Sequence, residues 1–116
     1  CDHFVSPEYK IGNIKNQTIT EMMYSAKQVN FGLDKFEKLP QQCRKCKYLF
    51  ACYGECPKNR IIKTLEGEAG LNYLCRGYYK FFDHVAPYME YMRNELINKR
   101  PAAGIMTSPL VHCAPK

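Results

Sequence analysis

Residues 43–75 read CRKCKYLFACYGECPKNRIIKTLEGEAGLNYLC. This cysteine segment holds five of the chain's seven cysteines: Cys43, Cys46, Cys52, Cys56 and Cys75. A Cys-x-x-Cys turn places two sulfurs on one side of a tight loop, where both thiolates can bind the same centre. Thiolates with few competing oxygen or imidazole donors select zinc or an iron–sulfur cluster, and all three histidines lie outside the segment. The segment therefore predicts a metal or cluster site that organises the fold.

The number of cysteines points to more than one centre. Four thiolates complete one centre, so five leave one ligand over. That surplus indicates a second centre with a ligand from elsewhere in the chain, for which Cys1 is the obvious candidate. We expect the seventh cysteine, Cys113, to be an unligated thiol.

Two other uses of the cysteines compete with this interpretation. A disulfide-bonded secreted domain is disfavoured because seven is an odd number, no signal peptide is visible, and Cys-x-x-Cys favours metal binding. A structural zinc site uses the same ligand spacing, so spacing alone does not exclude zinc. Iron–sulfur ligation is the leading interpretation, and zinc stays open as the alternative.

Length and composition bound the rest. A chain of 116 residues can bury one modest core, so we expect one domain or a piece of one. The chain begins on a cysteine that belongs to a proposed ligand set, and we therefore expect it to be a fragment of a longer protein. No apolar run could cross a bilayer and no targeting segment is visible, so a cytoplasmic protein with reduced thiols and no membrane contact is expected.

The net charge of +6 has two readings. Cations near a thiolate-ligated cluster stabilise its negative charge and tune its potential, while a basic surface that is merely solvated is equally common. The cations that flank the cysteines are Arg44, Lys45, Lys47, Lys58 and Arg60. No nucleic-acid recognition signature is present, so a nucleic-acid partner is not expected.

The apolar pattern predicts a mostly helical fold. Thr18-Ile-Thr-Glu21 is a capping box, followed by apolar residues at helical spacing as far as Val29, with Gly32 as the stop. A short turn over residues 33–39 and one helical turn between Cys46 and Cys56 are expected next. A long helix is predicted from Leu71 to about Leu96, with a kink or a break at Pro87.

The remaining segments are expected to be irregular. Residues 1–14 resemble half of a small β-hairpin, and residues 66–70 a surface loop. Residues 101–116, rich in proline and small residues, are expected to be extended or disordered. Around the cysteines, Tyr48, Phe50 and Tyr53 are expected to cover the site and exclude water, with Ile61, Ile62 and Leu65 packed nearby.

The cysteine spacing resembles that of the SPASM domain, the C-terminal auxiliary-cluster domain of many radical S-adenosylmethionine enzymes that modify peptides. The pattern that carries this resemblance is Cys43-x2-Cys46-x5-Cys52-x3-Cys56-x18-Cys75, preceded by Cys1. Within that group the chain resembles the anaerobic sulfatase-maturating enzymes at residues 1–5 (CDHFV), 11–14 (IGNI), 74–82 (LCRGYYKFF) and 101–106 (PAAGIM). This implies a SPASM domain over residues 1–106, followed by the tail at 107–116.

The resemblance also implies roles for individual residues. Those enzymes oxidise a cysteine or serine of a sulfatase precursor to Cα-formylglycine with S-adenosylmethionine and 4Fe–4S clusters. By resemblance the second auxiliary cluster would be held by Cys43, Cys46, Cys52 and Cys75. The first would be held by Cys1 and Cys56, together with two cysteines upstream of this chain, so it is incomplete here. Asp2 would be the base that takes a proton from the substrate.

The departure from that family is also informative. No Cys-x3-Cys-x2-Cys motif, which holds the radical-generating cluster, occurs in the sequence. We therefore expect the chain alone to be inactive and to need its own radical S-adenosylmethionine barrel as a partner. Two alternatives stay open: the SPASM domain of another peptide-modifying enzyme, and a zinc-stabilised binding module.

Overall fold

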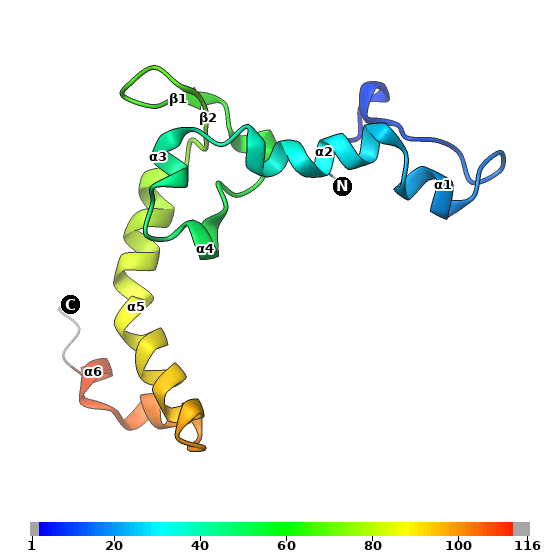
Figure 1. Ribbon diagram of the computed structural model, residues 1–116. Helices are drawn as coiled ribbons and strands as arrows, with labels where there is room; N and C mark the ends of the chain where they lie inside the picture. The colour runs from blue at the N-terminus through cyan, green and yellow to red at the C-terminus, as the bar shows by residue number, and fades with distance from the viewer. Residues whose placement is uncertain (1–2, 113–116) are drawn as a thin grey trace. The chain divides into compact units, whose positions relative to one another are not determined.

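The computed structural model describes residues 3–112 (Figure 1). The described chain is mostly helical with a single two-stranded antiparallel hairpin, which confirms the predicted fold class. It divides into two compact units, residues 1–76 and 77–116. The first unit contains the whole cysteine segment, and the helix that begins at Cys75 continues into the second unit.

The first unit opens with a short 3-10 helix, η1 (Pro7–Tyr9), and helix α1 (Ile19–Met23). The predicted capping box is present at α1. The Thr18 hydroxyl accepts a hydrogen bond from the Glu21 amide at 3.2 Å, and the Glu21 carboxylate accepts one from the Thr18 amide at 2.8 Å. Two amides without helical partners are thereby satisfied, as the sequence indicated.

Helix α2 (Ala26–Glu37) corrects the predicted boundary at Gly32. A new helix begins after Ser25, whose hydroxyl donates to the Met22 carbonyl at 2.8 Å and accepts from the Gln28 amide at 3.3 Å. Gly32 lies inside α2, and no atom lies within 4 Å of the position its Cβ would take. The expected stop at Gly32 and separate turn over 33–39 are therefore wrong, because nothing at Gly32 diverts the backbone.

The cysteine segment contains short elements only. Helix α3 (Gln41–Arg44) and helix α4 (Leu49–Cys52) are followed by the 3-10 helix η2 (Pro57–Asn59). The helical turn expected between Cys46 and Cys56 is α4, so that prediction is confirmed. Because these elements are short, contacts between the turns determine the path of the backbone in the cysteine segment.

The β-hairpin lies at a different place from the one predicted. Strands β1 (Ile62–Lys63) and β2 (Ala69–Leu71) pair antiparallel where a surface loop was expected. The Thr64 amide donates to the Glu68 carbonyl at 2.8 Å, and Gly67 closes the turn with a φ of 87°. In residues 3–14, the described part of the predicted N-terminal hairpin, the regular element is η1.

The buried core of the first unit is small and includes a cysteine. Leu39, Cys43 and Leu71 form it, with Leu49 and Cys75 packed against them. Several apolar side chains expected inside are exposed instead: Met23, Ile61, Ile62 and Leu65. Met22 is buried, as expected for one of the two methionines of the first apolar stripe.

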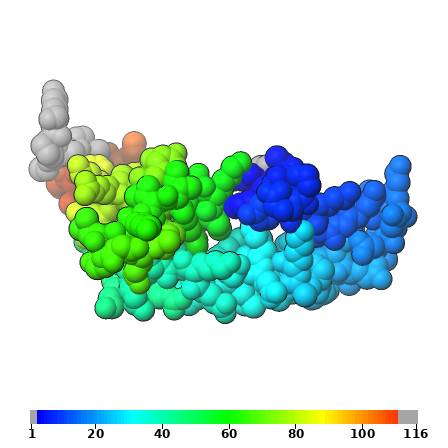
Figure 2. Space-filling model, turned by 90° about the horizontal axis from the view of Figure 1, so that it is seen from above, coloured from blue at the N-terminus to red at the C-terminus, as the bar shows by residue number. Residues whose placement is uncertain are grey.

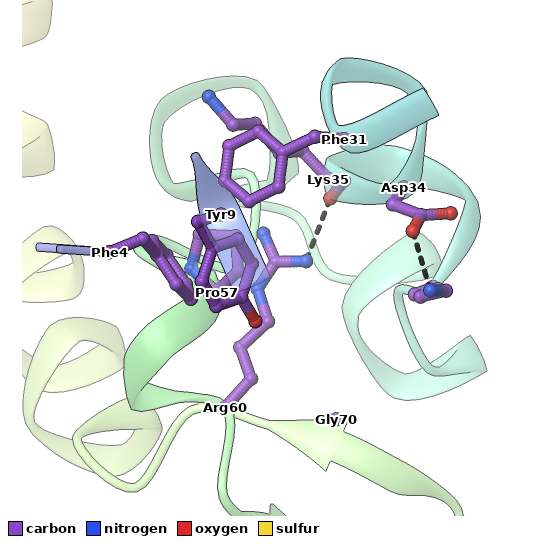
Figure 3. Close-up of a pocket in the computed structure, with 9 residues that line it drawn as sticks. Phe4, Tyr9, Phe31, Asp34, Lys35, Pro57, Arg60 and Gly70 are labelled. Carbon is purple, nitrogen blue, oxygen red and sulfur yellow. Dashed lines mark hydrogen bonds and ion pairs between the residues drawn. The ribbon is translucent and has the colours of Figure 1, made fainter. Parts of the chain in front are cut away.

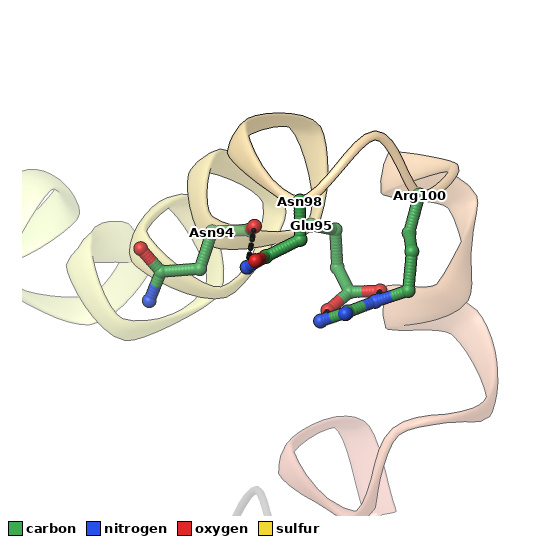
Figure 4. A network of polar contacts seen from close by, with 4 residues as sticks. All are labelled: Asn94, Glu95, Asn98 and Arg100. Atoms are coloured by element: carbon green, nitrogen blue, oxygen red, sulfur yellow. Dashed lines mark hydrogen bonds and ion pairs between the residues drawn. The ribbon is translucent and has the colours of Figure 1, made fainter.

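The second unit begins within helix α5 (Cys75–Ile97), which confirms the predicted long helix. The helix begins at Cys75 and not at Leu71, which belongs to β2, and it continues through Pro87 without the predicted break. At its end, the guanidinium of Arg100 donates to both carboxylate oxygens of Glu95, at 2.9 and 2.6 Å (Figure 4). The Asn98 side chain donates to the Asn94 carbonyl at 2.8 Å. The Asn94 carbonyl also accepts from the Asn98 backbone amide at 3.1 Å, so these side-chain contacts add to the backbone bonds at the end of α5.

The chain after α5 is helical and not extended as far as the structure describes it. Its elements are the 3-10 helix η3 (Ala102–Thr107) and helix α6 (Pro109–His112). The expected extended conformation is therefore wrong for residues 102–112, and the rest of the predicted tail, with Cys113, lies outside the described residues. None of the described helices is long and apolar enough to span a membrane.

Replacing Gly32 with alanine is expected to stabilise the protein by about 0.5–1 kcal/mol, because alanine loses less backbone freedom in a helix interior. Urea denaturation would measure the change in the free energy of unfolding. Gly12→Ala is the control, since its added Cβ would meet the side chains of Gln17 and Met22, and it should not stabilise. A Gly32→Ala protein no more stable than wild type would contradict a continuous α2.

Candidate metal centre

Cys43 lies at the centre of the candidate site. It sits in α3, is buried against Leu39 and Leu71, and its amide donates to the Pro40 carbonyl at 2.9 Å. Pro40 precedes the helix and fixes how the chain enters it. One thiol of the Cys-x-x-Cys pair is thus held inside the core, and Cys46 follows it in the next turn, half-buried.

Cys75 approaches the same core from the start of α5. Its amide donates to the Asn72 carbonyl at 3.0 Å, and the Gln42 side-chain amide lies 3.9 Å from its sulfur. Asn72 is the most deeply buried side chain of the described residues. Its Oδ1 accepts from the Leu74 amide at 2.9 Å, and its Nδ2 lies 3.5 Å from the Gly54 carbonyl. Asn72 therefore connects the start of α5 to the loop between Cys52 and Cys56.

Cys46 and Cys52 lie on either side of α4. The Tyr48 amide points at the Cys46 sulfur, 3.4 Å away, and Cys52 is the last residue of the helix. An amide N–H that faces a sulfur stabilises the thiolate and tunes a bound metal or cluster. Both thiols are half-buried, so each is reachable from outside while remaining close to the core.

The electrostatics connect the four cysteines. The pKa of the Cys43 thiol is raised to about 11, first by burial and then by the charges of neighbouring thiolates: Cys75, Cys52 and, more weakly, Cys46. Burial also raises the pKa of Cys75, again with Cys52 and Cys46 as the next causes. Adjacent thiolates repel one another unless a cation lies between them. The four-cysteine set (Cys43, Cys46, Cys52 and Cys75) thus shares one neighbourhood.

This donor set fits the group that the spacing predicts. All five described cysteines are free thiols, and thiolates are the ligands that iron–sulfur clusters and zinc prefer. Within residues 3–112, no three cysteine, histidine or acidic side chains are gathered closely enough around one point to hold a single metal ion. Four soft donors around a shared core would supply a complete ligand set for one cluster.

Cys56 has a different surrounding. Its sulfur lies 3.4 Å from Nδ1 of His3, and the Lys58 ammonium donates to the His3 carbonyl at 2.7 Å. Figure 2 shows the dark blue N-terminal stretch beside the green cysteine segment and over the cyan helix α2. The sequence analysis did not predict that His3 lies at the site. Its position two residues after Cys1 was the only feature of the sequence that could have indicated this. Cys1 and Asp2 themselves lie outside the described residues.

The aromatic residues expected to cover the site do so only in part. Tyr48 is buried, whereas Phe50 and Tyr53 are 79% and 53% exposed. Tyr53 instead lies 5.9 Å from the ring of Phe36 at the end of α2. The prediction that all three aromatics exclude water is therefore wrong for Phe50 and Tyr53.

The loop between Cys52 and Cys56 has an unusual backbone. Tyr53, Gly54 and Glu55 all have positive φ values, of 46°, 68° and 54°. We call residues 53–55 the left-handed turn. Gly54 is buried under Leu39, and a Cβ at Gly54 would collide with the Leu39 side chain. Glycine is favoured at this position, because the backbone conformation is strained for other residues and an added Cβ would displace the Leu39 side chain.

Comparison with known proteins agrees with this chemistry. The family of iron–sulfur cluster-binding domains named SPASM matches residues 1–47. The chain is 61% identical over 106 residues to a serine-type anaerobic sulfatase-maturating enzyme of Bacteroides thetaiotaomicron, covering 91% of this chain and 26% of that protein. It is 31% identical over 96 residues to a cysteine-type enzyme of Clostridium perfringens, covering 83% of this chain and 25% of that protein.

A third relative, a serine-type enzyme of Klebsiella pneumoniae, is 34% identical over 95 residues, which are 81% of this chain and 22% of that protein. The chain spans about a quarter of the length of these curated relatives. No solved structure matches the chain significantly.

The five described cysteines are free thiols, and residues 1–47 are similar to the SPASM class of iron–sulfur cluster-binding domains. In sequence it is related to the anaerobic sulfatase-maturating enzymes, of both the serine and the cysteine type.

Replacing Gly54 with alanine is expected to weaken metal binding by about tenfold or more, because it disturbs the loop that carries Cys52 and Cys56. Competition with a chelator would measure the binding. Gly67→Ala is the matched control: its φ is also positive, at 87°, but nothing lies within 4 Å of the added Cβ. Both variants should lose about 1–3 kcal/mol of stability to backbone strain. An equal loss of metal binding in Gly67→Ala would contradict a specific role for Gly54.

Proposed function

We propose that the four-cysteine set holds a 4Fe–4S cluster, the second auxiliary cluster of a radical S-adenosylmethionine enzyme. The observation that supports this most directly is that Cys43 lies in the small core with Cys75 packed against it, while the charges of Cys46 and Cys52 act on both thiols. A bound cluster would supply a site that accepts and passes on electrons. The surrounding residues would hold the sulfurs, limit access of water and supply amide donors.

We further propose that Cys56 and Cys1 are ligands of a first auxiliary cluster. Cys56 lies beside His3, two residues from Cys1 in sequence, so the N-terminal stretch and the cysteine segment meet at this thiol. The other ligands would come from outside this chain. We also propose that the domain extends over residues 1–106.

The proposed activity is that of an anaerobic sulfatase-maturating enzyme, in which a serine or cysteine of a sulfatase precursor becomes Cα-formylglycine. Once a hydrogen atom has been removed from the substrate carbon, oxidation to the aldehyde releases one proton and one electron. Asp2 is the residue we propose to take the proton. The 61% identity to a serine-type enzyme, against 31% to a cysteine-type enzyme, favours serine as the target.

A pocket in the first unit is our candidate for binding part of the substrate peptide. Its volume is about 270 Å³. Phe4, Tyr9 and Phe31 form the aromatic cluster along one side, with ring centroids 4.5–6.0 Å apart (Figure 3). Lys35 lies beside Phe31, with its ammonium over the Phe31 ring at 5.2 Å from the centroid. Flat apolar walls of this kind suit a peptide side chain, and Phe4 follows the proposed base by two residues.

The same proposal implies a cellular location and a set of partners. Reduced thiols and iron–sulfur clusters indicate the cytoplasm. The partners are the sulfatase precursor and the radical S-adenosylmethionine barrel, and we propose neither a nucleic acid nor a membrane. A zinc-stabilised binding module is the second candidate, favoured by the ability of four thiolates to bind zinc in a preparation exposed to air.

Iron, acid-labile sulfide and zinc should be measured in this chain after reconstitution without oxygen. About four irons and four sulfides per chain are expected. Cys75→Ser should lower both, because it removes one of the four ligands, whereas Cys113→Ser should leave both unchanged. About one zinc per chain that iron and sulfide do not displace would support the binding module instead.

Activity should be tested in the whole enzyme, with serine and cysteine forms of a sulfatase peptide and mass spectrometry of the product. The serine peptide is expected to become the aldehyde. Asp2→Asn should lower kcat by about 10²–10⁴-fold, because it removes the proton acceptor, and Phe31→Ala should raise KM. Glu66→Gln, on an exposed turn, is the control. An enzyme that cleaves S-adenosylmethionine but forms no aldehyde would contradict this activity and favour another peptide modification.

A further inference from the structure

The guanidinium of Arg60 donates hydrogen bonds to four backbone carbonyls, three of them within the cysteine segment. Its Nη2 donates to the carbonyls of Tyr53 and Glu55, both at 2.9 Å, and its Nε donates to that of Gly54 at 3.1 Å. Its Nη1 donates to the Lys35 carbonyl at 2.8 Å, the contact dashed in Figure 3. One guanidinium therefore binds all three carbonyls of the left-handed turn and one from the last turn of α2.

The left-handed turn needs such a partner. Two of its three residues, Tyr53 and Glu55, carry side chains in a backbone region that is costly for them. The turn is also the whole connection between Cys52 and Cys56, so its conformation sets the direction in which each thiol points. The planar fork of an arginine offers several donors at fixed angles, which a lysine ammonium cannot reproduce.

The charge of Arg60 also faces the thiols. Burial lowers its pKa, while the thiolates of Cys43, Cys52 and Cys56 act in the opposite direction. Arg44, the other arginine of the segment, is turned toward the end of α2, where it donates to the carbonyls of Leu39 at 3.1 Å and Glu37 at 2.7 Å. Two arginines thus bind backbone carbonyls, but only Arg60 binds the turn between two proposed ligands.

We propose that Arg60 is a positioning residue that fixes Cys52 and Cys56 relative to each other through the left-handed turn. It would thereby hold one ligand of each proposed cluster from a single side chain. The inference rests on the proposed function, since it concerns how those ligands are placed. It assigns Arg60 a structural task at the site that is separate from neutralising the charge of a cluster.

The test compares Arg60→Lys, Arg60→Met and the matched control Arg44→Lys in the full chain, reconstituted with iron and sulfide without oxygen. The rate at which a chelator removes iron measures how firmly the ligands hold it. Wild type and Arg44→Lys should behave alike. Arg60→Lys keeps the positive charge but loses the planar fork of donors. It should hold iron about 10–100-fold more weakly, and the chelator should therefore remove iron correspondingly faster. The electron paramagnetic resonance spectrum of any remaining reduced cluster should differ from that of wild type.

Each other outcome is decisive. A wild-type chain that binds no cluster would overturn the proposed function itself. A wild-type chain with a cluster that Arg60→Lys retains equally well would overturn only the role of Arg60. If Arg60→Met loses the cluster and Arg60→Lys retains it, the charge of Arg60 and not its fork holds the cluster. If Arg60→Lys loses its helical circular dichroism, the substitution disrupts the whole fold. Either outcome would also overturn the inference.

Discussion

The proposed cluster requires sulfurs from several short turns of the first unit to be held together. A large apolar core is not available for this, since the buried cluster around Cys43 consists of Leu39, Cys43 and Leu71, with two further side chains packed against it. Small domains commonly compensate for limited burial with disulfides or bound metals. Here one proposed ligand, Cys43, is itself part of the core, so metal binding at the thiols would be coupled to packing of the chain.

Polar contacts hold the segments of the first unit together, a role that apolar packing has in larger domains. The buried Asn72 ties the start of α5 to the Gly54 carbonyl, and Arg60 binds the same carbonyl from the other side. Gly54 is therefore a shared point of contact between two segments that carry proposed ligands. A buried carbonyl with two donors is well satisfied, and this explains how a loop of unfavourable backbone conformation is kept in one form.

The sequence predicted the features that local chemistry decides. The Thr18 capping box, the helical turn before Cys52 and the long helix from Cys75 are each encoded within a few residues. The boundary between α1 and α2 was missed because the Ser25 hydroxyl competes with the apolar period, a contact that the pattern of apolar residues does not contain. The position of the hairpin was missed because Thr64 and Gly67 make a turn within a segment that reads as polar loop.

The candidate site likewise combines features that local sequence predicts with features that depend on distant contacts. Cys-x-x-Cys spacing limits which sulfurs can meet, so the sequence supports a prediction of the ligands. The contacts of Asn72, Arg60 and His3 span 5 to 53 residues, and no local pattern predicts them. The contact between His3 and Cys56 joins the two ends of the first unit's sequence. His3 directly follows Asp2 in the sequence, so the proposed base is next in the chain to a residue that contacts a proposed ligand of the first cluster. A carboxylate that takes a proton and a cluster that takes an electron work best side by side, since the two charges then leave the substrate together.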